Sequence, residues 1–178
     1  DSVLAVSGQL NRKMSGPGTY LSIPKEALEG NSDPHKIWKP LNEPEASRRT
    51  VYAFVKRSLV VPLLEVFDLC DTTRSTEIRN ITSVAPQALT FFNGEFVNRQ
   101  ASHFANRLEV EAGPNRTQQI ELAYRLALCR RPTQHEIEVL QKFLSNEERA
   151  SSKQGKQQGE SLSTSDVRHR ALIQMCRV

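Results

Sequence analysis

Three carboxylates that could do chemistry lie close together in this sequence, on Glu65, Asp68 and Asp71. Glycoside hydrolysis uses two carboxyl groups about 5–10 Å apart, one as the acid and one as the base or nucleophile. The two aspartates, with the hydroxyl of Thr72, could instead give oxygen ligands to calcium. A strong calcium loop also needs a glycine and a closing glutamate, and Glu77 is the only later acid nearby. No metal site is therefore predicted, and Glu65, Asp68 and Asp71 are the candidate catalytic acids and bases.

The competing interpretation makes this segment a structural turn. Aspartate and threonine side chains accept hydrogen bonds from nearby backbone N–H groups, which favours turns. In such a turn the carboxylates of Asp68 and Asp71 pair with Arg74 or Arg79 and take no part in catalysis. The incomplete calcium pattern favours this turn over a metal loop.

Basic residues before and after this turn form a second candidate site. Guanidinium groups match the oxygens of anions, so these residues could bind an anion such as a sulfated glycan, or dock a partner. The alternative is a solvated helix face with ion pairs to Glu65, Asp68 or Asp71, because exposed charge runs are common and stabilise little. The candidate anion- or partner-binding residues are Arg48, Arg49, Lys56, Arg57 and Arg79.

Other catalytic and cofactor patterns are missing from the sequence. It contains no Gly-x-Ser-x-Gly elbow, no glycine-rich phosphate loop and no Cys-x-x-Cys pair. Without Cys-x-x-Cys-His this segment attaches no c-type haem, and no cofactor is expected in it. The isolated histidines are expected at the surface or at helix ends, not on a metal: His35, His103, His135 and His169. The cysteines are odd in number and cannot all pair internally: Cys70, Cys129 and Cys176.

Length and charge limit the kinds of partner. A chain of 178 residues is enough for one domain of ordinary size. Its formal charge of +4 comes from scattered basic residues, whereas a nucleic-acid binder concentrates them on one face, so no nucleic acid is expected. No apolar run approaches the ~18 residues that span a bilayer. The chain begins with Asp and ends inside an expected helix, so we interpret it as a fragment of a longer protein.

Helices are expected to position the candidate residues, because apolar side chains recur mostly at helical spacing. The clearest helices are predicted over residues 96–108, 120–128 and 137–144. Thr133 and Glu136 have the spacing of a capping box at the start of the last one. The predicted fold class is therefore mainly α: an irregular multi-helix bundle with little or no β structure.

The remaining segments complete a single predicted domain over residues 1–178. Residues 1–46 are expected to form a short helix and an extended, proline-rich arm, with Tyr20 and Trp38 among its anchors. Residues 47–144 form the helical core, beginning with a helix that carries Val51, Val55 and Leu59 on one face. Residues 145–164 are polar and predict a mobile loop, and residues 165–178 begin a truncated C-terminal helix.

Long ordered runs of residues make this chain resemble a known family. It is similar to the C-terminal domain of unknown function found in large planctomycete proteins, where the domain commonly follows a cytochrome-c-like module. The resemblance covers nearly the whole chain. The matching runs are Arg48-Arg49, Tyr52-x-Phe54-Val55-Lys56-Arg57-Ser58-Leu59, Pro62-x-Leu64-Glu65-x-Phe67-Asp68, Asp71-Thr72, Arg79-Asn80-x-Thr82, Pro86-Gln87-Ala88-Leu89, Asn93-x-x-Phe96-Val97 and Ala123-Tyr124-Arg125-Leu126-Ala127-Leu128 with Arg131-Pro132-Thr133 and Glu136.

The resemblance gives a context and assigns no catalytic residue. It implies a secreted or cell-envelope protein, outside the cytoplasm, with electron-transfer or polysaccharide-related neighbours. Haem would then belong to an upstream domain of the parent protein. The family often has a Cys-Pro pair before the arginine at position 79, but this chain has Thr76-Glu77-Ile78 there, which argues against thiol chemistry at that place.

Three functions follow from these observations. The first is a non-catalytic interaction or scaffold module that binds other domains of its own polypeptide, because no catalytic constellation is recognisable. The second is an enzyme domain acting on polysaccharide through Glu65, Asp68 and Asp71. The third is a docking surface for a cytochrome-c-like electron-transfer module, formed by the basic segment from Arg48 to Arg57. A glycan or other anionic partner fits the same basic segment.

Overall fold

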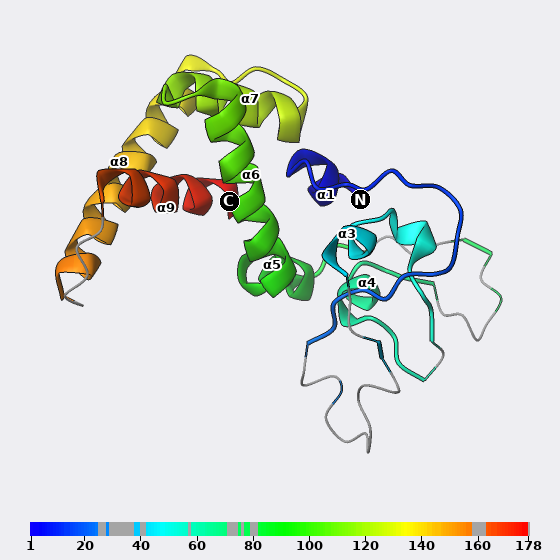
Figure 1. The fold of residues 1–178 in the computed structure, drawn as a ribbon. Helices are drawn as coiled ribbons and strands as arrows, with labels where there is room; N and C mark the ends of the chain where they lie inside the picture. Colours follow the sequence, from blue (N-terminus) through cyan, green and yellow to red (C-terminus); the bar gives the residue numbers. More distant parts are fainter. Residues whose placement is uncertain are drawn as a thin grey trace. The chain divides into compact units, whose positions relative to one another are not determined.

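The computed structural model describes residues 1–24, 28, 38–39, 42–56, 58–70, 75, 77–78, 82–157 and 163–177, with only the backbone of 154–157. The described residues form helices and contain no strand, which confirms the predicted mainly α fold (Figure 1). The helices are α1 (Ser2–Val6), α3 (Glu43–Ala46), the 3₁₀ helix η2 (Thr50–Tyr52), α4 (Pro62–Val66), α5 (Ala85–Asn93), α6 (Glu95–Ala112), α7 (Arg116–Leu128), α8 (Gln134–Gln157) and α9 (Thr164–Arg177).

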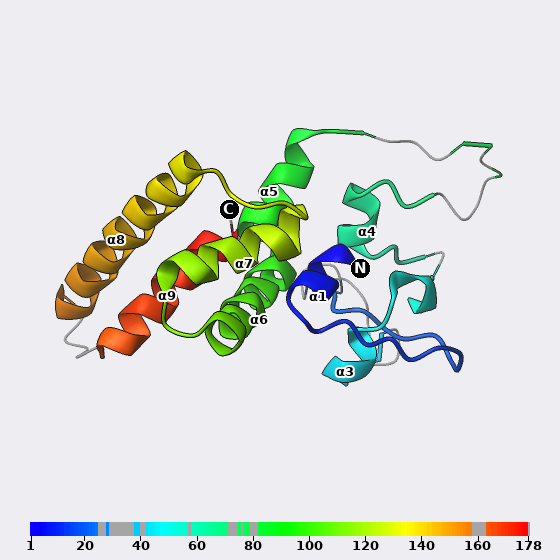
Figure 2. The same cartoon turned by 90° about the horizontal axis from the view of Figure 1, so that it is seen from above.

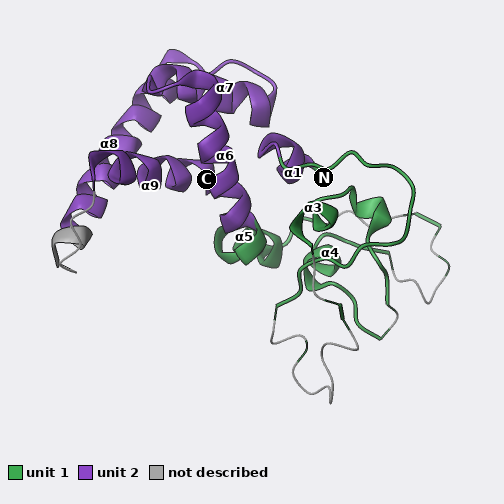
Figure 3. Cartoon of the chain, in the orientation of Figure 1, with its two compact units in different colours: residues 1, 9–96 green, residues 2–8, 97–178 purple. Residues whose placement is uncertain are grey.

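The chain divides into two compact units (Figure 3). Unit 1 consists of Asp1 and Gln9–Phe96. Unit 2 consists of Ser2–Gly8 and Val97–Val178. Unit 1 contains short helices and long connections, and unit 2 contains most of the long helices.

The core of unit 2 is built from four helices with apolar residues at helical spacing. Its buried side chains come from α6, α7, α8 and α9: Phe104, Ala105, Leu108, Ile120, Ala123, Leu144, Ala171, Leu172 and Met175. Gly113 ends α6 with a φ of +66°, a left-handed conformation that favours glycine. Asn115 then caps α7 by accepting hydrogen bonds from the backbone N–H groups of Thr117 and Gln118. The three helices predicted over 96–108, 120–128 and 137–144 are therefore confirmed.

Helix α8 differs from its prediction. It begins as expected, since Thr133 and Glu136 form the predicted capping box. It then continues to Gln157, so the part of the predicted loop from 145 to 157 is helical, and 158–162 lie outside the described residues. Residues 145–154 contain no proline or glycine, and the helix-forming residues among them are Glu147, Glu148, Arg149, Ala150, Lys153 and Gln154. Helix α9 packs against α8, and Figure 2 shows the two helices side by side.

Unit 1 contradicts the helix predicted from residue 47 to 59. The chain there forms η2 and then an extended segment, and Val51 is 75% exposed. The described backbone hydrogen bonds inside this segment are short-range, such as that from the Tyr52 N–H to the carbonyl of Arg49, and other backbone groups pair with the N-terminal arm. The Thr19 N–H donates to the carbonyl of Tyr52 at 2.8 Å, and the Phe54 N–H donates to the carbonyl of Thr19 at 2.7 Å. Isolated bridges join Asn11 to Arg48 and Thr19 to Ala53.

The arm of unit 1 is held by the aromatic residues that the sequence indicated. Trp38 is 5% exposed, and its indole N–H donates to the carbonyl of Leu21 at 2.8 Å. The ring of Tyr20 meets Trp38 edge-on at 5.1 Å and lies 4.8 Å from the ring of Phe54. Tyr20 and Trp38 are therefore confirmed as anchors of the arm.

Candidate functional site

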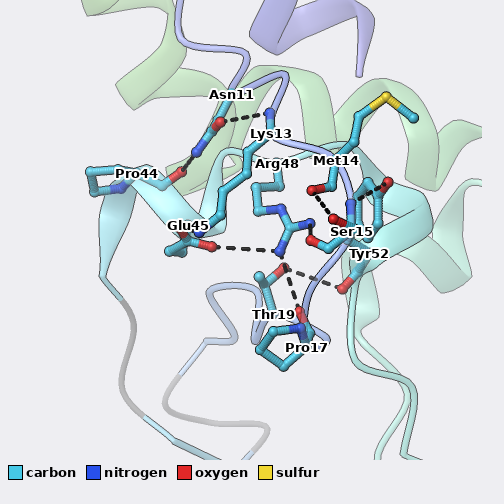
Figure 4. Close-up of polar contacts among 10 residues, drawn as sticks. All are labelled: Asn11, Lys13, Met14, Ser15, Pro17, Thr19, Pro44, Glu45, Arg48 and Tyr52. Atoms are coloured by element: carbon cyan, nitrogen blue, oxygen red, sulfur yellow. Dashed lines mark hydrogen bonds and ion pairs between the residues drawn. The ribbon is translucent and has the colours of Figure 1, made fainter.

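Arg48, a predicted anion-binding residue, lies inside unit 1 and is the centre of its densest polar cluster (Figure 4). Its side chain is 0% exposed. The guanidinium donates to the carbonyl oxygen of Ser15 at 2.6 Å and to that of Pro17 at 3.3 Å. It also lies over the ring of Tyr52, 4.1 Å from the ring centre. One buried cation thus fixes the arm at Ser15–Pro17 to the segment that carries Tyr52.

The charge of Arg48 is balanced at the edge of this cluster by Glu45. The nearest guanidinium nitrogen and carboxylate oxygen are 3.5 Å apart. Lys13 donates to the same carboxylate at 2.8 Å, and this hydrogen bond, with the two positive charges, holds the pKa of Glu45 below its usual value. Asn11 adds a hydrogen bond to the carbonyl of Pro44 at 2.8 Å. Every group in the cluster therefore ties the arm to residues 44–52.

The polar cluster around Arg48 holds segments of the backbone together, because its guanidinium group binds two carbonyl oxygens and lies over an aromatic ring. The Nε of Arg48 is buried without a hydrogen-bond partner among the described residues. A ligand in solvent has no access to a side chain that is fully covered. Arg48 therefore stabilises unit 1 and does not present its charge to an external anion.

The other basic candidates that the structure describes, Arg49 and Lys56, do not form one surface with the buried Arg48. Arg49 is 53% exposed in its side chain and lies 3.9 Å from the carboxylate of Asp1. Lys56 is partly buried and pairs with Leu59 in an isolated bridge. Arg57 and Arg79 lie outside the described residues. The described part of this segment is not the continuous basic helix that the sequence predicted.

Among the acidic candidates, Asp68 is held by a neighbour that the sequence analysis did not assign to it. Asp68 has a φ of +58°, and its carboxylate accepts a hydrogen bond from the backbone N–H of Thr82 at 2.8 Å and from the Thr82 hydroxyl at 2.8 Å. Gln87 donates to the carbonyl of Val66 at 3.0 Å and to the Thr82 hydroxyl oxygen at 3.3 Å. The signal was present, since Thr82 and Gln87 both belong to the family-like runs.

Glu65, the other acidic candidate that the structure describes, is exposed in the first turn of α4. Asp71 lies outside the described residues, as do Arg74 and Arg79, the partners predicted for Asp68 and Asp71. Asp68 therefore acts as a brace between the end of α4 and the start of α5 within unit 1.

Metal-binding and redox groups are spread over the structure. No three His, Cys, Asp or Glu side chains within the described ranges come together as metal ligands. The three cysteines are unpaired thiols; Cys70 and Cys129 are exposed, and burial raises the pKa of Cys176 to about 12. His169 lies 3.0 Å from the carboxylate of Glu109 in unit 2. None of the described helices has both the length and the apolar character of a membrane span.

The chain is therefore a mainly α protein, and Arg48 and Asp68, two residues of the runs that resemble a known family, connect segments of its backbone. A family model described as PSD1, protein of unknown function (DUF1553), matches residues 1–144, and the chain belongs to that family. This confirms the resemblance to a domain of unknown function. No curated protein and no solved structure matches the chain.

Proposed function

We propose that this chain is an interaction module, without catalytic activity of its own, in a larger protein outside the cytoplasm. The observation that carries the proposal is an apolar surface at α5 in unit 1. Val84, Leu89 and Phe92 are 48%, 58% and 53% exposed, and Phe91 is 41% exposed beside Phe67. Large apolar side chains gathered on one short helix are typical of a surface that another protein covers.

The contacts of the polar residues support the same function. The guanidinium of Arg48 is used by two backbone carbonyls and Tyr52, and the carboxylate of Asp68 is used by Thr82. These residues lie in the family-like runs, and each stabilises a connection between segments of unit 1. A module that presents a surface of unit 1 to a partner needs this kind of internal bracing, because the longest described helix of that unit, α5, has nine residues.

The partner we propose is another domain of the same polypeptide. The family resemblance supports it, since the resembled domain occurs in large multidomain proteins and commonly follows a cytochrome-c-like module. Interfaces between domains of one chain are moderate in area and partly apolar, which suits a surface the size of one helix face. The location outside the cytoplasm rests on the same resemblance.

The experiment compares hydrogen exchange in α5 between the isolated chain and its parent polypeptide. We expect the α5 amides to exchange more slowly in the parent, and we expect Leu89→Glu to remove this difference, because a charge at the interface opposes desolvation. The matched control is Val110→Glu, at an isolated apolar residue of α6 that is 85% exposed. Equal exchange of α5 in both proteins would contradict the proposal.

No contact among the described residues favours the polysaccharide enzyme or the docking of an electron-transfer module through residues 48–57. The enzyme remains a separate alternative with a direct test. If the chain hydrolysed a polysaccharide and Asp68→Asn abolished that activity, the enzyme would replace the interaction module as the function.

A further inference from the structure

A groove between α8 and α9 in unit 2 gathers positive charge. Its volume is about 590 Å³, which lies in the range of about 300–1,000 Å³ that small-molecule sites occupy. Helix α8 contributes Glu148, Arg149, Ser152 and Lys153, and α9 contributes Thr164 and Arg168. Both helices belong to the same compact unit, so the groove is a property of unit 2 alone.

The cations of this groove are not neutralised by the residues that the structure describes. Arg149, Lys153 and Arg168 are exposed and have no ion-pair partner in the part of the chain that the structure describes. Glu148 is the one acid among the groove residues named above, and its carboxylate is paired with Arg116. The groove therefore keeps three positive charges for whatever enters it.

The arrangement of these cations has a cost in the empty protein. Arg149 and Lys153 stand four residues apart on α8 and therefore on the same face of the helix. Like charges at this spacing weakly destabilise a helix, and Arg168 adds a third positive charge from the neighbouring helix. A bound anion would remove this repulsion.

The donors around the groove fit an oxyanion with two negative charges. Two guanidinium groups and one ammonium group supply charge-assisted hydrogen bonds to tetrahedral oxygens. The hydroxyl of Thr164, at the start of α9, lines the same groove and can add a donor. The geometry points to a binding site for a phosphate or sulfate ester between α8 and α9.

A second hollow supplies space for the molecule that carries the ester. It has a volume of about 480 Å³ and shares Glu148, Thr164 and Arg168 with the cationic groove. Pro114 and Leu172 add apolar surface there, so a less polar group can lie beside the oxyanion site. The ester group would then occupy the cationic end and its organic part would extend into the second hollow. The site lies in unit 2 and does not depend on the apolar surface of α5.

The experiment titrates the chain with glucose 6-phosphate and glucose 6-sulfate and follows backbone amide signals by NMR. Glucose and sodium chloride at matched ionic strength are the reference titrations. We expect either ester, and neither reference, to shift the signals of Arg149, Lys153 and Arg168. The two arms show whether the site takes phosphate, sulfate or both.

Variants test whether the groove cations carry the binding. Arg168→Gln and Lys153→Gln should each raise the Kd by about fivefold or more, since each removes a charge-assisted hydrogen bond. Arg170→Gln is the matched control, because Arg170 is exposed on α9 and does not line the groove. The proposed site would be wrong if sodium chloride caused the same signal shifts as the esters. It would also be wrong if Arg168→Gln and Arg170→Gln bound the esters with the same Kd. All three positions are exposed, so the variants should fold, and circular dichroism checks this.

Discussion

Two adjacent arginines differ completely in what they do, and this difference can be tested. Arg48→Met removes a buried guanidinium from two carbonyl oxygens and from Glu45, so we expect it to lower the free energy of unfolding of unit 1 by about 3 kcal/mol. Hydrogen exchange at the amides of Thr19 and Phe54, which join the arm to residues 52–54, measures the loss.

The neighbouring residue supplies the control for Arg48. Arg49 is half-exposed and makes one long ion pair, so Arg49→Met should change the same free energy by less than about 0.5 kcal/mol. Equal effects of the two substitutions would show that burial of Arg48 does not stabilise the arm.

At the scale of residues, the sequence predicts those whose chemistry alone favours burial. Tyr20 and Trp38 were predicted as anchors because large aromatic side chains gain most from burial. Arg48 could not be distinguished from Arg49, because its burial depends on carbonyl oxygens of Ser15 and Pro17, far away in the sequence. Thr82, which donates to the carboxylate of Asp68 from 14 positions further along the chain, could not be assigned to it for the same reason.

The cap of α8 gives a prediction at the scale of one element. The Thr133 hydroxyl accepts from the backbone N–H of Glu136, and the Glu136 carboxylate accepts from that of Thr133. Thr133→Ala should lower the free energy of unfolding of unit 2 by about 1 kcal/mol, measured by denaturant titration. The pKa of Glu136 is lowered to about 2, from its ordinary value of 4.5, mainly by hydrogen bonds from Arg130 and next by the hydrogen bond from the Thr133 backbone.

The lowered pKa of Glu136 sets the direction of the pH dependence of the cap. The carboxylate form is favoured by folding, so its contribution is complete above pH 4.5 and is lost as the pH falls towards 2. In Glu136→Gln this part of the acid destabilisation should be absent. Glu138→Gln, on the same helix and outside the cap, is the control and should keep it. An unchanged acid profile in Glu136→Gln would refute the assignment.

Elements were predictable where local sequence decides them. The start of α8 and the lengths of α6 and α7 follow from apolar spacing, caps and glycine, which all act within a few residues. Residues 47–59 also show helical spacing, yet backbone groups of Ser47, Tyr52 and Phe54 pair with the arm. Residues 145–157 have no large apolar residue, yet continue a helix already begun, because extending a helix costs less than starting one.

At the scale of the molecule, the sequence predicts the helical class and not the division into units. The division depends on where buried side chains gather, and helical spacing is equally regular on both sides of residue 96. In unit 1 two of the described apolar residues, Trp38 and Val61, are buried. Unit 2 has a continuous buried cluster that includes Leu108, Ile120 and Leu172.

This unequal burial predicts unequal stability of the two units. Fully burying one large aliphatic side chain contributes about 1.5–3 kcal/mol, so the amides of α6 and α7 should open with a free energy several kcal/mol above those of residues 11–54. Native-state hydrogen exchange at increasing denaturant measures both values. Leu108→Ala, at a residue with no exposed surface, should lower the value for α6 by about 2–5 kcal/mol. If the slowest amides lay in unit 1, burial in the α6–α9 core could not be what sets the stability of this chain.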